Sequence, residues 1–406
     1  MSRLKHIVIV SNFWDNFFFF ARLADTLKIQ GIRVTFLTVK YALWREMISR
    51  GWQTVLVKRN PVAEQKSLPE KVLEIPEGGL TPDEALRVHN AIQHALPRLM
   101  KSDPFDGLMM WSGVRLVEKS VTTFAIEHAV PTLYLELGNF PGKIFADSLG
   151  TNVSSSLAMN PASVLGYQHD PTRYAQWRDD YLRASLQTHA VPQGKDASSL
   201  RVKPVLKDYY GYLFHSCLKS AKLLPFGKLW NKLLLRYAKL PAVEIPEHHP
   251  QYFFYPMQVS DDAQILLNSP VDNEAAIRYA AAQASQSGYA LIVKPHPAER
   301  NFSFMKRIAA MQQELGFTFA AGNTMKLMQR AEKIITVNST AGLQAKILGK
   351  DVEVLGSAFW KGYGEQELAA YIHGFLIDCP FWGTTAISPE TAGNLLSRYN
   401  SGGDSE

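Results

Sequence analysis

The chain reads Ala-Leu-Ile-Val-Lys-Pro-His-Pro at residues 290–297 and Lys-Ile-Ile-Thr-Val-Asn-Ser-Thr-Ala-Gly at residues 333–342. In both stretches a short apolar run is followed directly by polar residues, a pattern typical of a buried parallel strand that ends in a loop. Ligands of open α/β sheets bind outside the carboxyl ends of the strands. The first loop carries a lysine and an imidazole, and the second leads into a helix. Together they predict an α/β domain that binds a phosphate-bearing donor.

Strand and helix patterns alternate in both halves of the chain. In the first half, apolar runs predict strands at 6–10, 32–37, 54–57, 107–111 and 132–135. In the second half they predict strands at 252–256, 290–293, 318–320, 333–337 and 352–355. We therefore expect an α/β fold, GT-B-like, with two Rossmann-like domains facing across a cleft. The expected divisions are an acceptor-side domain over 1–245 with a helical insertion at about 152–240, a donor-binding domain over 246–385, and a terminal helix and tail over 386–406.

Composition narrows the class of protein. The 406 residues are 46% hydrophobic and 20% charged, enough for two domains with cores of their own. Cys217 and Cys379 form no zinc spacing and no disulfide framework, which favours a reducing compartment. No stretch approaches the roughly 18 apolar residues that a membrane span needs. We expect a cytoplasmic protein, peripheral on the inner face of the cytoplasmic membrane.

Positive charge is concentrated in residues 201–240. This segment holds nine Lys and Arg residues against one acid, Asp208, with Tyr, Phe, Trp and Leu residues between them. Cations interleaved with bulky apolar groups suit an anionic membrane surface or an amphiphilic acceptor. A helical lobe with a solvated basic face is the alternative. Nucleic acid is not expected as a partner, because no recognition motif accompanies the charge.

Three groups of polar residues are candidates for chemistry. His296 lies between two prolines that stiffen its loop, beside Lys294, and could donate to a phosphate; it could equally be an ordinary surface histidine. Ser339 and Thr340 could bind phosphate, cap the following helix, or do both. A third group follows the predicted strand at 252–256 and comprises Gln258, Asp261, Asp262 and Gln264.

A carboxylate in this third group could attack an anomeric carbon or bind a substrate hydroxyl, although adjacent aspartates often just begin a helix. In the first half, Glu136 ends a predicted strand before the turn residue Gly138 and is a candidate acid/base, or else a cap or ion-pair residue. The chain has no phosphate loop, no His-Glu-x-x-His and no Gly-x-Ser-x-Gly motif. We expect no metal, because Glu247-His248-His249 has no further ligand at a sensible spacing.

Five ordered fragments resemble the capsule polysaccharide synthesis family of bacterial β-Kdo glycosyltransferases. They are Glu136-Leu-Gly138, Gly150-Thr-Asn152, Gln258 with Asp262-Ala-Gln264, Lys294-Pro-His-Pro297, and Asn338-Ser-Thr-Ala-Gly342. The resemblance implies a retaining, metal-independent glycosyltransferase that uses CMP-β-Kdo as its donor substrate, with no cofactor, and forms a covalent Kdo–aspartate intermediate. It implies a lipid or glycolipid acceptor and a place in a capsule assembly complex.

The resemblance also implies roles for residues. Asp262 would be the nucleophile, Glu136 the acid/base, and His296 a catalytic and donor-binding residue. The other donor-binding residues would be Lys294, Asn338, Ser339, Thr340, Gln258 and Gln264, and the acceptor-side residues would be Gly138 and Asn152. The segment Asn139-Phe-Pro-Gly142 departs from the family pattern, which leaves the acceptor open. Two other hypotheses remain: a different nucleotide-sugar or CDP-polyol transferase, and a non-catalytic scaffold of a polysaccharide assembly or export complex.

Overall fold

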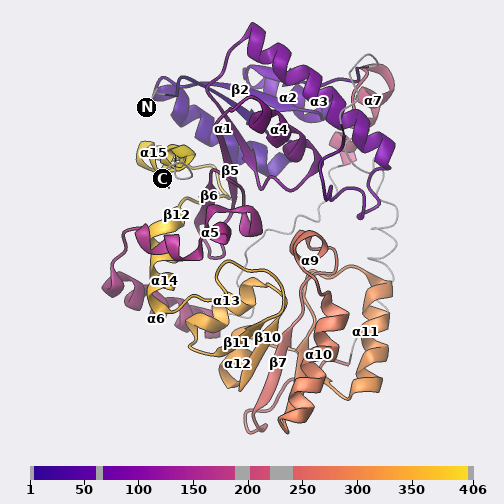
Figure 1. Cartoon of the computed structure of the whole chain (residues 1–406), viewed down its shortest axis with the longest axis vertical. Coiled ribbons are helices and arrows are strands. Elements are labelled where there is room, and N and C mark those ends of the chain that lie inside the picture. Colours follow the sequence, from indigo (N-terminus) through magenta and orange to yellow (C-terminus); the bar gives the residue numbers. More distant parts are fainter. Residues whose placement is uncertain (1–3, 61–66, 188–201, 220–240, 401–406) are drawn as a thin grey trace. The chain divides into compact units, whose positions relative to one another are not determined.

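The computed structural model describes residues 4–60, 67–187, 202–219 and 241–400. The chain forms two compact units (Figure 1). Unit 1 comprises Met1–Asn160, Gln193–Leu224 and Phe375–Glu406, and unit 2 comprises Pro161–Pro192 and Pro225–Gly374. Each unit contains one sheet, so the predicted α/β fold with two sheets is confirmed. The cleft expected between the two domains stays a prediction.

Unit 1 contains a seven-stranded sheet in the order β12-β6-β5-β4-β1-β2-β3. Five strands are parallel: β1 (His6–Val10), β2 (Arg33–Thr38), β3 (Thr54–Leu56), β4 (Gly107–Trp111) and β5 (Thr132–Leu137). The antiparallel strand β6 (Lys143–Asp147) pairs with β5 and with β12 (Ile377–Asp378). The order of the strands reverses between β1 and β4, which makes this pair the topological switch point of the sheet.

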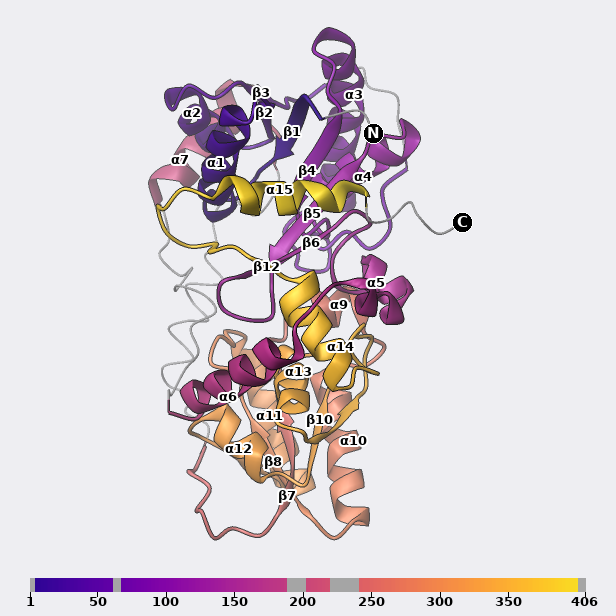
Figure 2. The same ribbon diagram turned by 90° about the vertical axis from the view of Figure 1, so that its left-hand side faces the viewer.

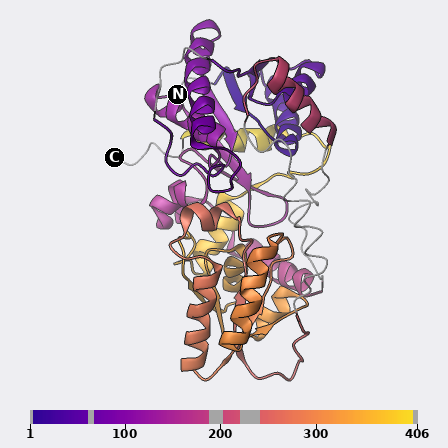
Figure 3. The same cartoon turned by 90° about the vertical axis from the view of Figure 1, so that its right-hand side faces the viewer.

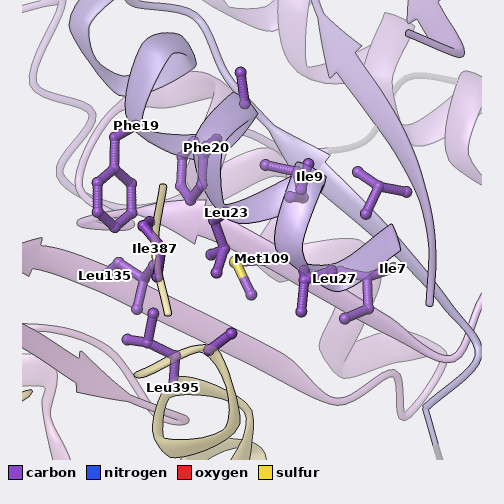
Figure 4. Packing of buried hydrophobic residues seen from close by; sticks show 14 of the residues in the cluster. Ile7, Ile9, Phe19, Phe20, Leu23, Leu27, Met109, Leu135, Ile387 and Leu395 are labelled. Atoms are coloured by element: carbon purple, nitrogen blue, oxygen red, sulfur yellow. The ribbon is translucent and has the colours of Figure 1, made fainter. Parts of the chain in front are cut away.

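Helices cover both faces of this sheet because the strand residues alternate between two cores. Ile7 and Ile9 face one core and Val8 and Val10 the other. The first core is covered by α1 (Trp14–Ile29), α2 (Tyr41–Ser49) and α15 (Pro389–Ser397), and the second by α3 (Pro82–Ser102) and α4 (Leu116–Glu127). The first core joins side chains from both ends of the chain (Figure 4): Phe19, Phe20, Leu23 and Leu27 of α1 meet Ile387 and Leu395. The unit also contains α5 (Ser156–Met159), α7 (Val202–Phe214) and the 3-10 turns Asn152–Ser154 and Arg398–Asn400.

Unit 2 contains a five-stranded parallel sheet in the order β11-β10-β7-β8-β9. Its strands are β7 (Tyr252–Pro256), β8 (Ala290–Lys294), β9 (Thr318–Phe319), β10 (Lys333–Thr336) and β11 (Asp351–Val354). The central strand β7 is buried along its whole length, as an apolar strand between two helical layers should be. One layer contains α10 (Asn273–Gln286) and α11 (Phe302–Leu315), which lie side by side (Figure 3), and the other α12 (Thr324–Arg330) and α13 (Thr340–Ile347).

The unit boundaries differ from the sequence expectation of 1–245, 246–385 and 386–406 in two places. Helix α6 (Pro171–Gln187) belongs to unit 2, because Tyr181, Leu182 and Leu186 pack on its core and Asn323 donates to the Ser185 carbonyl at 2.8 Å. The segment that begins at Phe375 belongs to unit 1, where β12 extends the sheet and α15 packs against α1 (Figure 2). Most predicted strands lie where the structure has them, but β6, β12 and α2 were not predicted.

The packing of α13 on its sheet generates a stability prediction. A Cβ atom on Gly342 would lie 2.7 Å from both Thr336 Cγ2 and Trp360 Cη2. Replacing Gly342 with alanine should therefore lower the free energy of unfolding by about 1–3 kcal/mol. Gly393 in α15 is the matched control, because a Cβ there meets no atom within 4 Å. Gly393→Ala should raise stability by roughly 0.5–1 kcal/mol. Thermal unfolding of both variants checks this, and equal shifts would contradict the packing.

Candidate functional site

The candidate site of unit 2 lies where three neighbouring parallel strands end. Strands β10, β7 and β8 are adjacent in the sheet, so their carboxyl ends lie along one edge. The segment after β7 carries Gln258 to Asp262, the segment after β8 carries His296 to Glu299, and the segment after β10 carries Asn338 to Thr340. All the donor-binding residues expected from the sequence therefore lie in this unit.

Two amide side chains join the ends of β7 and β10. Gln258 Nε2 donates to Asn338 Oδ1 at 2.9 Å, and the Asn338 backbone N–H donates to Gln258 Oε1 at 3.1 Å. Asn338 Nδ2 also donates to the Gln264 carbonyl at 3.1 Å. The backbone of Gln258 is held in turn by Asn273, which accepts from its N–H and donates to its carbonyl. Gln258 is buried, so the bonds to its side chain and backbone satisfy groups that water does not reach.

Asp262 is the N-cap of α9 (Ala263–Asn268). Its Oδ1 accepts a hydrogen bond from the Gln264 N–H at 2.9 Å. Burial raises the pKa of the Asp262 carboxyl, while the Gln264 N–H, His296 and Gln258 act to lower that pKa. The adjacent Asp261 is exposed and adds to the rise in the Asp262 pKa. Both sequence interpretations of this residue are compatible, because a helix cap can also face a ligand.

His296 is held in one tautomer by its own loop. Nδ1 accepts from the Ala298 N–H at 3.1 Å, so Nε2 carries the hydrogen of the neutral ring and is available to donate. The residue is exposed, yet the surrounding protein removes enough hydration to lower the pKa of His296, and Asp262 and Glu299 oppose this shift. Asp262 and His296 thus act on each other electrostatically, each favouring the charged form of the other.

Glu299 organises these loops and was not identified from the sequence. Its carboxylate is buried and accepts from the Ser260 N–H at 2.7 Å and from the Ser260 hydroxyl at 3.2 Å. It also accepts from the N–H groups of Arg300 and Asn301, at 2.8 and 2.7 Å. Glu299 therefore ties the segment that carries Asp262 to the segment that carries His296. The sequence offers no local signal for this, since Ser260 and Glu299 are far apart along the chain.

Lys294 and Ser339 border the same edge. Lys294 Nζ donates to Thr324 Oγ1 at 2.6 Å, and burial lowers the pKa of the Lys294 ammonium. Ser339 is the N-cap of α13, where its hydroxyl accepts from the Ala341 N–H at 3.1 Å, and Thr340 is the first residue of the helix. The capping role expected for Ser339 is thus present. A cation and a helix N-terminus on one edge can attract an anion.

The residues expected on the acceptor side lie in unit 1. Glu136 is in β5, and its Oε2 accepts from Asn152 Nδ2 at 2.9 Å. Gly138 is required by space, because a Cβ there would lie 2.8 Å from Lys143 Cβ. The loop that carries Asn152 is held by Asp147, which is buried and accepts from the N–H groups of Leu149 and Ser156 at 2.8 and 3.0 Å. A single site that joins this group to Asp262 stays a prediction.

Comparison with known proteins gives the family. A family model described as "Capsule polysaccharide biosynthesis protein" matches residues 106–370, about two thirds of the chain. The chain belongs to this family. The resemblance seen in the sequence is thereby confirmed at the level of the family, while the donor, acceptor and mechanism that it implies stay predictions.

Curated relatives match shorter stretches. Protein FixF of Sinorhizobium fredii is 32% identical over 115 residues, which cover 27% of each chain. Capsule polysaccharide export protein KpsS of Escherichia coli is 26% identical over 144 residues, which cover 32% of this chain and 37% of KpsS. The chain therefore matches well under half the length of these two relatives.

Solved structures share the architecture only distantly. A Thermosulfurimonas dismutans structure titled "KpsC, beta Kdo 2,7 transferase" is 14% identical with a TM-score of 0.41, covering 98% of this chain and 100% of that one. UDP-GlcNAc 2-epimerase from Neisseria meningitidis is 10% identical with a TM-score of 0.29, covering 97% and 99%. Likeness at this level carries no argument about activity.

Within residues 4–60, 67–187, 202–219 and 241–400, no three His, Cys, Asp or Glu side chains gather in a way that could hold a metal ion. Within the same ranges, every helix is too short or too polar to span a bilayer.

The coupling of Asp262 and His296 generates a prediction about titration. Because the Asp262 carboxylate stabilises the imidazolium, Asp262→Asn should lower the pKa of His296 further below its ordinary value of about 6.5. Asp261→Asn is the matched control and should leave the His296 pKa nearly unchanged, since Asp261 is not among the groups that shift it. NMR titration of the imidazole nitrogens, assigned with His296→Gln, measures both. The same His296 pKa in the wild-type protein, Asp262→Asn and Asp261→Asn would show that Asp262 does not face the ring.

Proposed function

We propose that this protein is a retaining β-Kdo glycosyltransferase of capsule or related surface polysaccharide biosynthesis. It transfers Kdo from CMP-β-Kdo to a lipid or glycolipid acceptor through a covalent adduct on Asp262. Membership of the capsule polysaccharide biosynthesis family supports the setting. The single observation that supports the chemistry is the buried Glu299 carboxylate, which ties the segment of Asp262 to the segment of His296 at one sheet edge.

The first step of the proposal breaks the bond between the sugar and the phosphate. An Asp262 oxygen attacks the anomeric carbon while the bond from that carbon to the phosphate oxygen breaks, and CMP leaves with the bonding electrons. The Nε2–H of His296 is suited to donate to the departing phosphate, because Nδ1 is occupied as an acceptor. Lys294 and the N-terminus of α13, capped by Ser339, supply positive potential for the phosphate and the sugar acid.

The second step transfers the sugar to the acceptor. An acceptor hydroxyl attacks the anomeric carbon, Asp262 leaves as a carboxylate, and the hydroxyl proton passes to Glu136 as general base. Two inversions cancel, so the anomeric configuration is retained. Asn152 would orient the Glu136 carboxylate through the hydrogen bond at Oε2.

A membrane-bound acceptor is supported by α7, which belongs to the basic-aromatic segment 201–240; residues 202–219 of this segment are described, and Arg201 and residues 220–240 are not. Five large apolar or aromatic side chains of this helix are 44–70% exposed: Leu206, Tyr209, Tyr210, Leu213 and Phe214. Lys203 and Lys207 are also exposed, whereas Asp208 is turned inward and accepts from the Ala42 N–H at 2.8 Å. A face that presents apolar groups and cations suits the cytoplasmic leaflet of an anionic membrane.

The double-displacement mechanism can be tested by the mass of the protein. Wild-type protein incubated with CMP-β-Kdo, without acceptor, should gain the mass of one Kdo residue on Asp262. Asp262→Asn should gain no mass and lose transfer by at least about a thousandfold, because a nucleophile has no substitute. CMP binding, measured by calorimetry, should change little.

Asp261→Asn is the control for this experiment and should keep both the adduct and the transfer. Full transfer by Asp262→Asn would remove the mechanism. CMP binding without any adduct or transfer in the wild-type protein would favour the scaffold hypothesis. Transfer from a CDP-polyol instead of CMP-Kdo would favour the phosphotransferase.

The membrane contact predicts a loss of vesicle binding. Exchanging Lys203 and Lys207 for glutamine, and Leu213 and Phe214 for serine, should weaken co-sedimentation with phosphatidylglycerol vesicles by about tenfold or more, since each lysine contributes about 1 kcal/mol at an anionic surface. The control exchanges Lys306 and Lys326, two exposed lysines of unit 2, for glutamine and should bind normally. Equal sedimentation of both variants would return α7 to the solvated-helix hypothesis.

A further inference from the structure

The switch point of the unit 1 sheet carries a second group of polar side chains to which the proposed chemistry gives no role. The segments after β1, β2 and β4 meet there and contribute Ser11 to Phe13, Lys40, and Arg115. The crevice at the carboxyl ends of the strands that flank a switch point is where open α/β sheets bind their ligands. The topology of the sheet therefore predicts a ligand site here, and the side chains at the site indicate the chemistry of that ligand.

Two cations share one aromatic ring at this edge. The Phe13 ring, 38% exposed, has Lys40 Nζ at 4.7 Å and Arg115 Cζ at 5.3 Å from its centre. Arg115 is close enough to help lower the pKa of Lys40, after the larger effect of burial. Within the described part of the chain, no carboxylate lies within 4 Å of Lys40 Nζ. An anion placed beside this ring would be attracted by both cations.

The acids nearby contact Arg115 or backbone N–H groups rather than Lys40. Glu77 and Glu74 lie 3.3 and 3.7 Å from Arg115, and Glu74 also accepts from the Leu116 N–H at 3.0 Å. Glu118 is buried, and burial raises its pKa to about 7. Asp208, the largest favourable partner of Lys40, is itself bonded to the Ala42 N–H. None of these groups neutralises the ammonium by direct contact.

One buried polar atom at the same edge, Ser11 Oγ, has no hydrogen-bond partner among the described residues. Ser11 and Asn12 are 1% and 4% exposed, and the Asn12 side chain faces the Glu118 carboxyl, whose pKa it acts to lower. The Asn12 amide is fixed through its Oδ1, which accepts from the Thr38 hydroxyl at 3.2 Å and from the Val39 N–H at 3.1 Å. A buried polar group without a partner costs about 1–3 kcal/mol, and such groups often mark a site where a ligand completes the bonding.

We propose that Lys40, Arg115 and Phe13 form a subsite that binds the anionic group of the acceptor, either a phosphodiester or a sugar carboxylate. This inference rests on the proposed function for the identity of the ligand as an acceptor. The two cations hold the anion, Phe13 covers the apolar atoms next to it, and Ser11 supplies a polar contact. The subsite would position an acidic lipid or glycolipid by its anionic group. Other residues would contact the hydroxyl that reacts.

Acceptor kinetics test this subsite. Lys40→Met should raise the KM for an anionic acceptor by about tenfold or more, the value of one lost charge-assisted hydrogen bond, with kcat and the donor KM unchanged. Arg115→Gln should also raise the KM for the anionic acceptor, and this variant tests the subsite if Lys40→Met fails to fold. Lys101→Met, on the exposed end of α3, is the control. A neutral methyl-ester analogue of the acceptor should have the same KM in every protein.

Binding without a donor separates this inference from the proposed function. Glycerol phosphate and the methyl glycoside of Kdo, titrated separately into wild-type protein and Lys40→Met and followed by NMR, identify which anion is taken. Loss of binding in Lys40→Met supports the subsite even if no transfer from CMP-Kdo is ever seen. Unchanged anion binding in Lys40→Met, or an unchanged KM for the anionic acceptor, overturns the subsite while leaving the Asp262 chemistry intact.

Discussion

The candidate site of unit 2 depends on one pair of amide side chains. The Gln258 side chain donates to Asn338 Oδ1 and accepts from the Asn338 backbone N–H, which joins the ends of β7 and β10. Because each bond needs a donor opposite an acceptor, the two hydrogen bonds form together only when the strand ends are correctly aligned. The pair therefore fixes both the distance between the two strand ends and their offset along the strands. Gln258 also acts on the Asp262 carboxyl, lowering its pKa. The connection therefore links the geometry of the sheet edge to the charge of the residue proposed as nucleophile.

The charges at this edge are balanced rather than simply positive. Burial raises the pKa of Asp262 and lowers the pKa of Lys294 and His296, so each group is moved toward its neutral form. A phosphate that arrives there favours the charged forms of Lys294 and His296, whereas Asp262 must stay ionised to act as a nucleophile. The hydrogen bond from the Gln264 N–H helps to keep Asp262 ionised, because it stabilises the carboxylate without adding a proton.

Local patterns in the sequence predicted the strands and most of the residues at their ends. The run before Lys294 and the run before Asn338 are buried strands as expected, because apolar periodicity and flanking turn residues are local properties. Glu299 and Asn273 could not be found this way, since their hydrogen bonds reach Ser260 and Gln258 across the fold. Strand β6 was missed because Asn139-Phe-Pro-Gly142 reads as a loop without showing that the chain turns back antiparallel. Residue types at the strand ends predicted candidate chemistry for His296 and Glu136, whereas the identity of the donor and the acceptor came from the family resemblance.

The position of β12 and α15 affects the order in which the protein can be assembled. Both elements follow the whole of unit 2 in the sequence, yet they belong to the sheet and core of unit 1. On the ribosome, the strands from β1 to β6 emerge first and must wait, with one sheet edge and the face of α1 uncovered, until synthesis has passed residue 397. Unit 2 has all its strands by residue 354 and can fold during that interval. Unit 1 is thus the first unit to be synthesised and the last to complete its fold.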